Sequence, residues 1–273
     1  MSIDPRTLAQ ELLEAYRSGA VVAVPPSARD AEFDLNAAYH TEAAFAALRK
    51  SSGAKTVGWK VGYANKAMWR VLKLETLVWA HMYDDTVHYA SANAADYALP
   101  PHRAPKIEPE IVFKLRDPIT AAGLDAAAVL GSVEYVAIGF EIIDCPFPDW
   151  QVKPTDFVAA FGLHLGLVIG EPLQVNAASI PALVEQLASF KLKVSKNGEF
   201  VEEGSGRNSL RSPALCLAEL GGALLRGGGG EMLAAGDLIS SGTLTGGHLV
   251  QRGESWRVDV EGLPLAPLTV KLT

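Results

Sequence analysis

The apolar positions at the start of the chain recur at the spacing of an α-helix. One face of this segment carries Leu8, Leu12, Ala15 and Tyr16. Asp4 is suited to cap the helix, Pro5 to occupy its first turn, and Gly19 to end it. Because the apolar residues share one face, we expect this helix to lie against the rest of the protein.

A second helix is predicted over residues 37–49, with Asp34 or Asn36 as its cap. From Thr56 onward the periodicity changes from helical to alternating, which is typical of β-strands. The strands that we expect cover residues 56–63, 107–115, 134–143, 163–170, 191–194, 199–201, 237–240 and 256–260.

Asn197-Gly198, between two of these alternating segments, predicts a tight hairpin. Two helices interrupt the strand-rich region, one over Ile180–Ser189 and the other over Pro213–Arg226, which Ser212 is expected to cap. Helices at the front followed by many strands predict an α+β protein with a predominantly β body. Strands and helices do not alternate regularly enough for a doubly wound sheet or a TIM barrel.

Composition limits the possible partners of the chain. Of its 273 residues, 49% are hydrophobic and 20% charged, and the net charge of -7 comes without a basic stripe. Nucleic-acid binding is therefore not expected, because phosphates require clustered Lys and Arg. Two cysteines without metal-type spacing, no signal-peptide pattern and no apolar run of about 18 residues predict a soluble, cytoplasmic protein without a disulfide framework.

Two carboxylates fall on one face of a predicted strand, in the segment IEPEIVF at residues 107–113. Glu108 and Glu110 are two residues apart, so they project from the same side of the strand. Carboxylates that close repel each other unless a proton or a cation intervenes, and a hard divalent cation prefers such oxygen ligands. The alternative is an exposed edge strand with two solvated glutamates, which Pro109 would favour.

A third carboxylate lies in the middle of the apolar segment VAIGFEIID at residues 136–144. A lone charge at Glu141 is costly to bury unless it is paired or bound to a metal. Its same-face neighbours Ala137 and Gly139 are small and leave room beside it. The alternative is a buried glutamate satisfied by an arginine or by backbone donors.

Lys60 is the only long polar side chain on its face of the segment GWKVGY at residues 58–63. Gly58 and Gly62 flank it on that face, an arrangement that would open space around the ammonium group for a ligand or an anionic intermediate. The alternative is an ordinary surface lysine. His81, His88, His164 and His248 are scattered along the chain, and each is individually more simply explained as structural.

Taken together, these segments resemble the 2-keto-4-pentenoate hydratase / 4-oxalocrotonate decarboxylase family of the fumarylacetoacetate hydrolase superfamily. The resemblance covers almost the whole chain. The segments that carry it are Ala38-Tyr39, GWKVG at 58–62, IEPEI at 107–111 with Phe113, FEIID at 140–144, the stretch 156–170, and GDLISSG at 236–242.

The resemblance implies a fold and a metal. The fold is a small, partly helical N-terminal part over residues 1–70, followed by a catalytic domain over residues 71–273 built as a mixed β-sandwich roll. Glu108, Glu110 and Glu141 would hold Mg²⁺ or Mn²⁺, which acts as a Lewis acid on a 2-oxo acid or its enol form. Lys60 would be an acid/base or an electrostatic partner of the developing enolate. Family members are usually homo-oligomers, and a complex with a related pathway enzyme is a further expectation.

The chain departs from the family pattern around the expected substrate. Where the family carries an aspartate after the lysine motif, this chain has Val78, and within the segment that begins at Asp156 a polar pair becomes Ala160-Phe161. A serine position becomes His164. We therefore expect Val78, Asp156 and Phe161 to contact an altered, bulkier or more hydrophobic substrate. His164 is expected to take over a proton-transfer or substrate-contact role.

Hydration of a 2-hydroxy-2,4-dienoate is the activity expected first. Decarboxylation of a 4-oxalocrotonate-like acid remains open, because both reactions use the same ligands. Hydrolysis of a C–C bond in an acylpyruvate also remains open. So does a catalytically silent partner subunit, which the change at Val78 favours.

Overall fold

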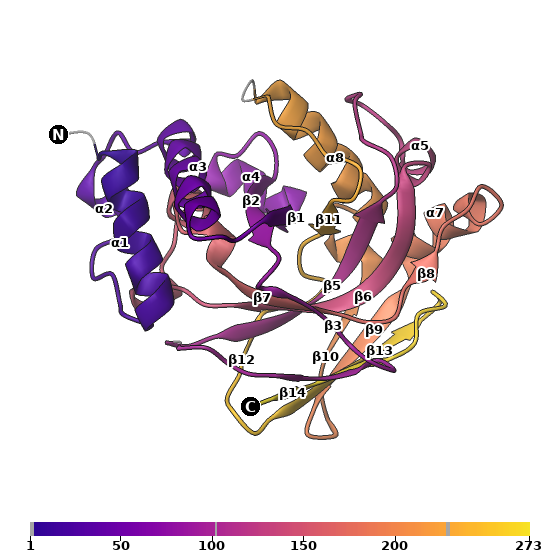
Figure 1. Ribbon diagram of the computed structural model, residues 1–273. Helices are drawn as coiled ribbons and strands as arrows, with labels where there is room; N and C mark the ends of the chain where they lie inside the picture. Colours follow the sequence, from indigo (N-terminus) through magenta and orange to yellow (C-terminus); the bar gives the residue numbers. More distant parts are fainter. Residues whose placement is uncertain (1–2, 102, 228–229) are drawn as a thin grey trace.

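The protein is built from two β-sheets with helices at one end and over one face, as the computed structural model of residues 3–101, 103–227 and 230–273 shows (Figure 1). The helices are α1 (Pro5–Ser18), α2 (Pro26–Arg29), α3 (Leu35–Ser51), α4 (Lys66–Leu72), α5 (Ala126–Leu130), α6 (Pro154–Ala159), α7 (Ile180–Ser189) and α8 (Pro213–Arg226). Short 3-10 turns occur at Pro148–Trp150, Phe161–Leu163 and Gly206–Asn208.

The strands follow the alternating segments of the sequence. They are β1 (Thr56–Gly62), β2 (Val78–Tyr83), β3 (Val87–Tyr89), β4 (Ala94–Tyr97), β5 (Lys106–Leu115), β6 (Val133–Ile143), β7 (His164–Ile169), β8 (Leu173–Gln174), β9 (Lys191–Lys196), β10 (Glu199–Ser205), β11 (Leu238–Ser240), β12 (His248–Leu249), β13 (Ser255–Glu261) and β14 (Leu268–Leu272). Every strand expected from the sequence is present, with ends that differ by at most four residues.

The larger sheet has the order β2-β1-β11-β5-β6-β7-β3, with β12 beside β5 and β8 beside β6. Within it, β1 runs parallel to β11 and β3 parallel to β7, while its other pairs are antiparallel. The smaller sheet has the order β10-β9-β13-β14-β4. The mixture of helices and curled mixed sheets confirms the predicted α+β class.

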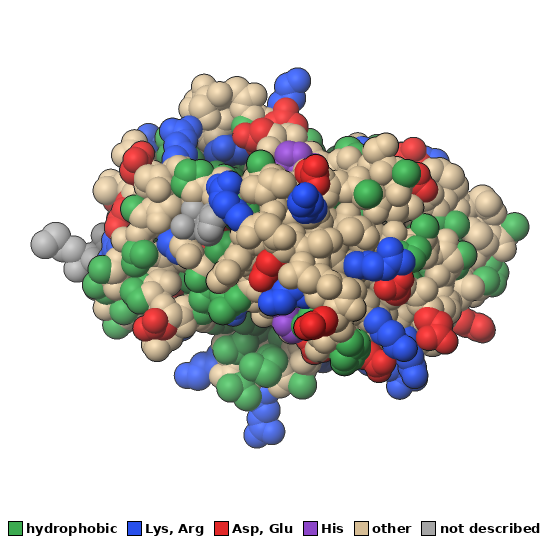
Figure 2. Space-filling model, turned by 90° about the horizontal axis from the view of Figure 1, so that it is seen from below, with side chains coloured by type: hydrophobic (Ala, Val, Ile, Leu, Met, Phe, Trp, Pro, Cys, Tyr) green, Lys and Arg blue, Asp and Glu red, His purple; other side chains and the backbone are tan. Residues whose placement is uncertain are grey.

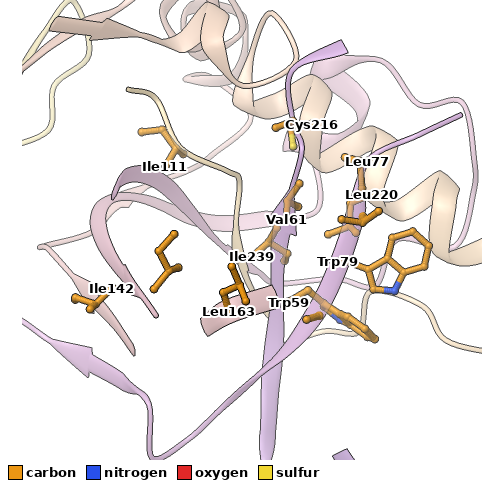
Figure 3. Close-up of a cluster of buried hydrophobic side chains, with 14 of the residues drawn as sticks. Trp59, Val61, Leu77, Trp79, Ile111, Ile142, Leu163, Cys216, Leu220 and Ile239 are labelled. Atoms are coloured by element: carbon orange, nitrogen blue, oxygen red, sulfur yellow. The ribbon is translucent and has the colours of Figure 1, made fainter. Parts of the chain in front are cut away.

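The main apolar core joins the large sheet to its covering helices and to the smaller sheet. Figure 3 shows part of it, where side chains of α8 meet those of β1, β2 and β11. Trp59 and Val61 project from β1 and Cys216 and Leu220 from α8, and all four are buried. Cys216 therefore belongs to the core, and both cysteines are free and buried.

The caps predicted for the first two helices are present. Asp4 accepts a hydrogen bond of 2.8 Å from the Thr7 backbone N–H, and Gly19 ends α1 in the left-handed conformation. Asp34, rather than Asn36, caps α3 by accepting from the Ala37 N–H at 2.8 Å. Once Asp34 is the cap, the helix begins at once, so α3 is longer at its start than the apolar pattern predicted.

The Asn197-Gly198 hairpin is confirmed, since β9 and β10 pair antiparallel and both turn residues have positive φ angles. The expected cap at Ser212 is wrong in one respect. Ser212 occupies the cap position of α8, but its side chain makes no cap hydrogen bond. Pro213 opens that helix, and because it has no N–H, the first turn has one fewer unpaired donor.

The division into residues 1–70 and 71–273 stays a prediction. β1, on the N-terminal side of that boundary, pairs with β2 and β11 inside the large sheet. The described part of the chain contains no helix long and apolar enough to cross a membrane. On the face shown in Figure 2, acidic and basic side chains are interspersed rather than gathered by sign.

Candidate metal centre and its cavity

Three glutamates from two neighbouring strands converge on one point. Glu108 and Glu110 project from the same face of β5, and Glu141 lies directly opposite Glu108 in the antiparallel register with β6. One carboxylate oxygen from each of the three lies within 4.8 Å of the others. The alternation along β5 and the register with β6 are together sufficient to assemble the cluster.

Pro109 does not make β5 an edge strand, so the two glutamates are not solvated residues of a sheet edge. β6 lies on one side of β5, and β11 and β12 lie on the other. The chain between β11 and β12 loops away opposite Pro109, where the Leu244 N–H donates to the Pro109 carbonyl at 2.9 Å. A proline is tolerated at such an interruption because no ladder hydrogen bond from its nitrogen is needed there.

Glu110 is fully buried and only half satisfied. Its Oε2 atom accepts hydrogen bonds from the Ser240 hydroxyl and, at 2.8 Å, from the Gly242 N–H. Its Oε1 atom is buried without a hydrogen-bond partner among the described residues. Burial and the neighbouring Glu141 hold the pKa of Glu110 well above its usual range. The free oxygen is therefore available to a cation.

Glu141 is the charged member of the cluster. It lies 3.1 Å from the Lys60 ammonium through Oε2 and 2.7 Å from His164 Nδ1 through Oε1. Burial alone would raise the pKa of Glu141, but Lys60 and His164 outweigh burial and lower it. Its partners are thus a lysine and a histidine, in place of the arginine or backbone donors considered from the sequence.

Glu108 borders the cavity and is less buried than the other two. Burial raises the pKa of Glu108 to about 7, against the opposing effect of Lys60. Lys60 thus lowers the pKa of all three carboxylates, and it contacts Glu141 directly. An all-carboxylate oxygen set of this kind, with one buried oxygen unpaired, fits a hard divalent cation such as Mg²⁺ or Mn²⁺.

Lys60 is buried against this cluster. Its Nζ atom donates to the Gly162 carbonyl at 2.8 Å and pairs with Glu141. Burial by itself would lower the pKa of Lys60, but the three glutamates raise it above the ordinary value. Lys60 is accordingly a retained ammonium group in the interior and not an ordinary surface lysine.

The glycines beside Lys60 do not leave open space, which corrects the expectation from the sequence. A Cβ atom on Gly58 would lie 1.9 Å from the Leu238 carbonyl oxygen, and one on Gly62 would lie 2.3 Å from the Phe157 ring. The glycines instead allow β11 to approach from one side and Phe157 from the other. The space available to a ligand lies elsewhere.

A cavity of about 580 Å³ adjoins Lys60 and Glu108. Its apolar wall includes Tyr63, Met68, Ile143, Trp150, Val152, Phe157 and Leu163. Its polar wall includes Lys106, Glu202, Asn208, Thr243 and Thr245. Such a volume is within the range of sites for small organic ligands.

Two polar groups of this wall are held in place by aromatic neighbours. The Lys106 ammonium lies 4.0 Å from the centre of the Trp150 ring. Glu202 accepts from the Gly246 N–H at 3.0 Å and lies 2.8 Å from His248 Nε2, and that histidine ring stacks on Trp256. His248 therefore helps to shape the rim of the cavity.

Four residues expected to contact substrate or exchange protons do not line this cavity. Val78 is buried behind Gly62, and Phe161 stacks on Phe45 with a ring distance of 4.0 Å. The Asp156 carboxylate accepts from the Ser27 N–H and hydroxyl and from the Lys153 N–H.

His164 is likewise enclosed, between Glu141 and Thr86. The structure thus brings Lys60, the three glutamates and His164 together, and places Val78, Asp156 and Phe161 outside the cavity wall.

Most of the cavity wall was not predicted from the sequence. Lys106 could have been found, because it shares the strand face of Glu108 and Glu110 by simple alternation. Trp150 and Asn208 end short 3-10 turns and Thr243 follows β11, so the three come from segments far apart in the sequence. No periodic pattern in the sequence marks their convergence.

The chain is similar to proteins whose activity or structure is known. Residues 67–271 match the family described as fumarylacetoacetate (FAA) hydrolase, C-terminal. The chain is 30% identical over 257 residues to a 2-hydroxyhexa-2,4-dienoate hydratase of Comamonas testosteroni, with 94% of each chain covered. It is 29% identical over 256 residues to a 4-oxalocrotonate decarboxylase of a Pseudomonas species, again with 94% of each covered.

Solved structures show the same fold. A 4-oxalocrotonate decarboxylase from Pseudomonas putida G7, complexed with magnesium and adipate, superimposes with a TM-score of 0.87 at 23% identity, covering 98% of this chain and 97% of the other. A fumarylpyruvate hydrolase from Pseudomonas aeruginosa, in complex with Mn²⁺ and pyruvate, gives a TM-score of 0.60 at 19% identity, with 79% and 88% covered.

Proposed function

This chain belongs to the fumarylacetoacetate hydrolase family, and from that premise we propose that it is a divalent-metal-dependent lyase that hydrates a 2-hydroxy-2,4-dienoate. The observation that carries the proposal is the buried cluster of Glu108, Glu110 and Glu141 beside Lys60, at a cavity of small-molecule size. A 2-hydroxyhexa-2,4-dienoate hydratase and a 2-hydroxypent-2,4-dienoate hydratase are each 30% identical to the chain, so hydration is the reaction proposed first.

The three glutamates are the proposed ligands of Mg²⁺ or Mn²⁺. Their support is the unpaired buried oxygen of Glu110 and the approach of all three carboxylates to within 4.8 Å. When bound, a divalent ion supplies Lewis-acid stabilisation of negative charge on the substrate's 2-oxygen. Ser240 and the Gly242 N–H orient Glu110, so that this ligand needs no rearrangement to bind.

Lys60 is proposed to stabilise the same negative charge from the protein side. Its ammonium is fixed by the Gly162 carbonyl and by Glu141, two acceptors that hold its N–H groups in place. Of the two roles expected from the resemblance, the electrostatic one is therefore better supported than that of a general base. Phe157 lies 4.8 Å from Nζ and shields this charge from bulk water.

Decarboxylation is the second candidate. A 4-oxalocrotonate decarboxylase matches over 94% of this chain, and another has the same fold. Both reactions need negative charge on the substrate's 2-oxygen to be stabilised, so the glutamates and Lys60 do not discriminate between them. Measuring which substrates are turned over does discriminate between them.

The test combines metal binding with turnover. Wild-type protein is titrated with Mn²⁺, and the ultraviolet absorbance of a 2-hydroxy-2,4-dienoate, of 4-oxalocrotonate and of an acylpyruvate is then followed. Glu108→Ala should weaken Mn²⁺ binding by more than about 10-fold, since even outer partners of metal ligands change affinity by that much. It should also abolish turnover.

Glu199→Ala, on the exposed hairpin, is the matched control and should change neither measurement. Loss of the diene without release of CO₂ supports hydration, whereas release of CO₂ from 4-oxalocrotonate alone replaces it with decarboxylation. Acylpyruvate cleavage would show a hydrolase. Metal binding without turnover of any of these acids would indicate a silent subunit, and absence of metal binding would refute the proposal.

We also propose that the protein is a cytoplasmic homo-oligomer, the common state in this family, and that it can associate with a related pathway enzyme. Sedimentation of the purified chain tests the oligomer: a single species at the monomer mass would contradict it. Co-purification from the native host, compared with a host lacking the gene, tests the complex.

A further inference from the structure

His164 connects the candidate metal centre to a turn at the edge of the large sheet. Its Nδ1 atom lies 2.7 Å from Glu141 Oε1, and its Nε2 atom lies 2.9 Å from Thr86 Oγ1. The ring is 2% exposed and does not line the cavity. With a polar partner at each ring nitrogen, it has no free nitrogen to present to a substrate, so the substrate-contact role expected from the sequence has no support in this geometry.

Thr86 is itself fixed by the turn between β2 and β3. Its hydroxyl donates to the Tyr83 carbonyl at 2.9 Å, and its own carbonyl accepts from the Leu167 N–H at 2.9 Å. The Thr86 hydroxyl oxygen is thereby held beside His164 Nε2, while His164 Nδ1 faces Glu141.

The other end of this chain of contacts fixes Glu141. Oε1 of Glu141 is held by His164, and Oε2 is held by Lys60 at 3.1 Å. Each carboxylate oxygen thus has one partner, on a different residue, and the carboxylate plane cannot rotate without losing a buried contact. Rotation would leave a buried carboxylate oxygen of Glu141 without its partner, which costs more free energy than the same loss at the surface. The observed orientation of Glu141 is therefore strongly preferred.

We propose that His164 and Thr86 are a pair of positioning residues that orient Glu141 for metal binding. The proposal rests on the proposed metal site, and it assigns to His164 a role that differs from proton transfer. Partners of this kind typically change metal affinity by 10–100-fold when removed. A ring that merely filled the core would affect stability and leave metal affinity unchanged.

The experiment measures Mn²⁺ affinity without substrate, by electron paramagnetic resonance of the free ion. His164→Ala should weaken binding by about 10–100-fold. His164→Asn should weaken it less, because an amide N–H can occupy the position of Nδ1 and keep the contact with Glu141 but not that with Thr86. Thr86→Val, which keeps the side-chain volume and removes the hydroxyl, should also weaken binding by several-fold.

A double variant distinguishes a positioning role of His164 and Thr86 from a role in packing alone. If Thr86 acts through His164, Thr86→Val should have little further effect in the His164→Ala background. Thr41→Val removes a buried hydroxyl in α3 that bonds to the Ala37 carbonyl, and it is the matched control for the loss of a hydroxyl. It should leave Mn²⁺ affinity unchanged.

Three results would count against these roles. Wild-type affinity in folded His164→Ala, or fully additive losses in the double variant, would overturn the positioning role. If His164→Ala fails to fold, Thr86→Val against Thr41→Val carries the test, and equal affinities for these two would overturn it. Failure of the wild type to bind Mn²⁺ would instead refute the proposed function.

Discussion

At the scale of single residues, the main feature of the site is the clustering of buried ionisable groups. Three glutamates and one lysine are packed together, and their pKa values are driven apart: the pKa of Glu110 is raised, the pKa of Glu141 is lowered, and Lys60 keeps its proton. Groups perturbed in this way beside a cavity are typical of active sites. The separation arises because Lys60 and His164 both contact Glu141 and neither contacts Glu110.

Lys60→Met tests the electrostatic role of the ammonium group. The change keeps much of the side chain's length and apolar volume but removes the charge, so turnover should fall by about 10²-fold or more. Mn²⁺ should still bind, because all three glutamates remain. The exposed Lys191→Met is the control and should retain wild-type kcat. Wild-type kcat in folded Lys60→Met would show that this ammonium takes no part in the reaction.

At the scale of secondary-structure elements, the site depends on how closely the strands approach. β1 carries Lys60 and runs parallel to β11, which carries Ser240 opposite Lys60 in the register. Gly58 permits this pairing, since its φ angle is +148° and a side chain there would meet the Leu238 backbone. The register of these two strands therefore places the lysine and the hydroxyl partner of Glu110 side by side.

Gly58→Ala should destabilise the fold by several kcal/mol, because the clash adds to the backbone strain of about 1–3 kcal/mol. Gly53→Ala is a matched control: its φ angle is also positive, at +99°, but nothing lies within 4 Å of the added Cβ. Gly53→Ala should therefore lose only the free energy that corresponds to the backbone strain. Urea unfolding of both variants measures the difference, and equal losses of unfolding free energy would show that close approach at Gly58 is unimportant.

At the scale of the whole molecule, two buried contacts fasten the N-terminal helices to the rest. Phe161 inserts between α1 and α3, where its ring meets Tyr16 and stacks on Phe45. Glu42 of α3 lies 2.8 Å from His81 Nδ1 on β2 and accepts from the His81 N–H at 3.0 Å. Phe161 thus packs at the junction between the helices and the sheet, outside the cavity wall.

The His81–Glu42 pair should make stability depend on pH. Burial alone would lower the pKa of His81, but Glu42 and Glu231 raise it against the opposing charge of Lys50. A raised pKa means that the stabilisation is fully present below the unfolded value of about 6.5 and is lost as pH rises through the folded value. The gap in unfolding free energy between wild type and Glu42→Gln should therefore be largest near pH 6 and shrink at alkaline pH.

Glutamine keeps an acceptor for the His81 N–H, so only the charge is removed. Urea unfolding at several pH values provides the measurement, with Glu199→Gln on the exposed hairpin as the reference. A gap that stays constant from pH 6 to pH 9 would show that His81 does not gain its charge from Glu42.

The sequence by itself determined four of the helices (α1, α3, α7 and α8), eight of the strands and the three glutamates, because these depend on local rules. Side-chain alternation along β5 puts Glu108 and Glu110 on one face, and a single charge inside an apolar strand marks Glu141. Caps at Asp4 and Asp34 follow from short-range hydrogen bonding. Each of these signals lies within a few residues, so each could be read without knowing the fold.

Only the tertiary structure decided what surrounds the glutamates. The register of β5 with β6 sets Glu141 opposite Glu108, and the approach of segments distant in the sequence brings Trp150, Asn208 and Thr243 to the cavity. The same approach encloses His164 between Glu141 and Thr86. Such contacts join residues far apart in the chain, and they are selected by burial and packing of the whole molecule, which no local pattern encodes.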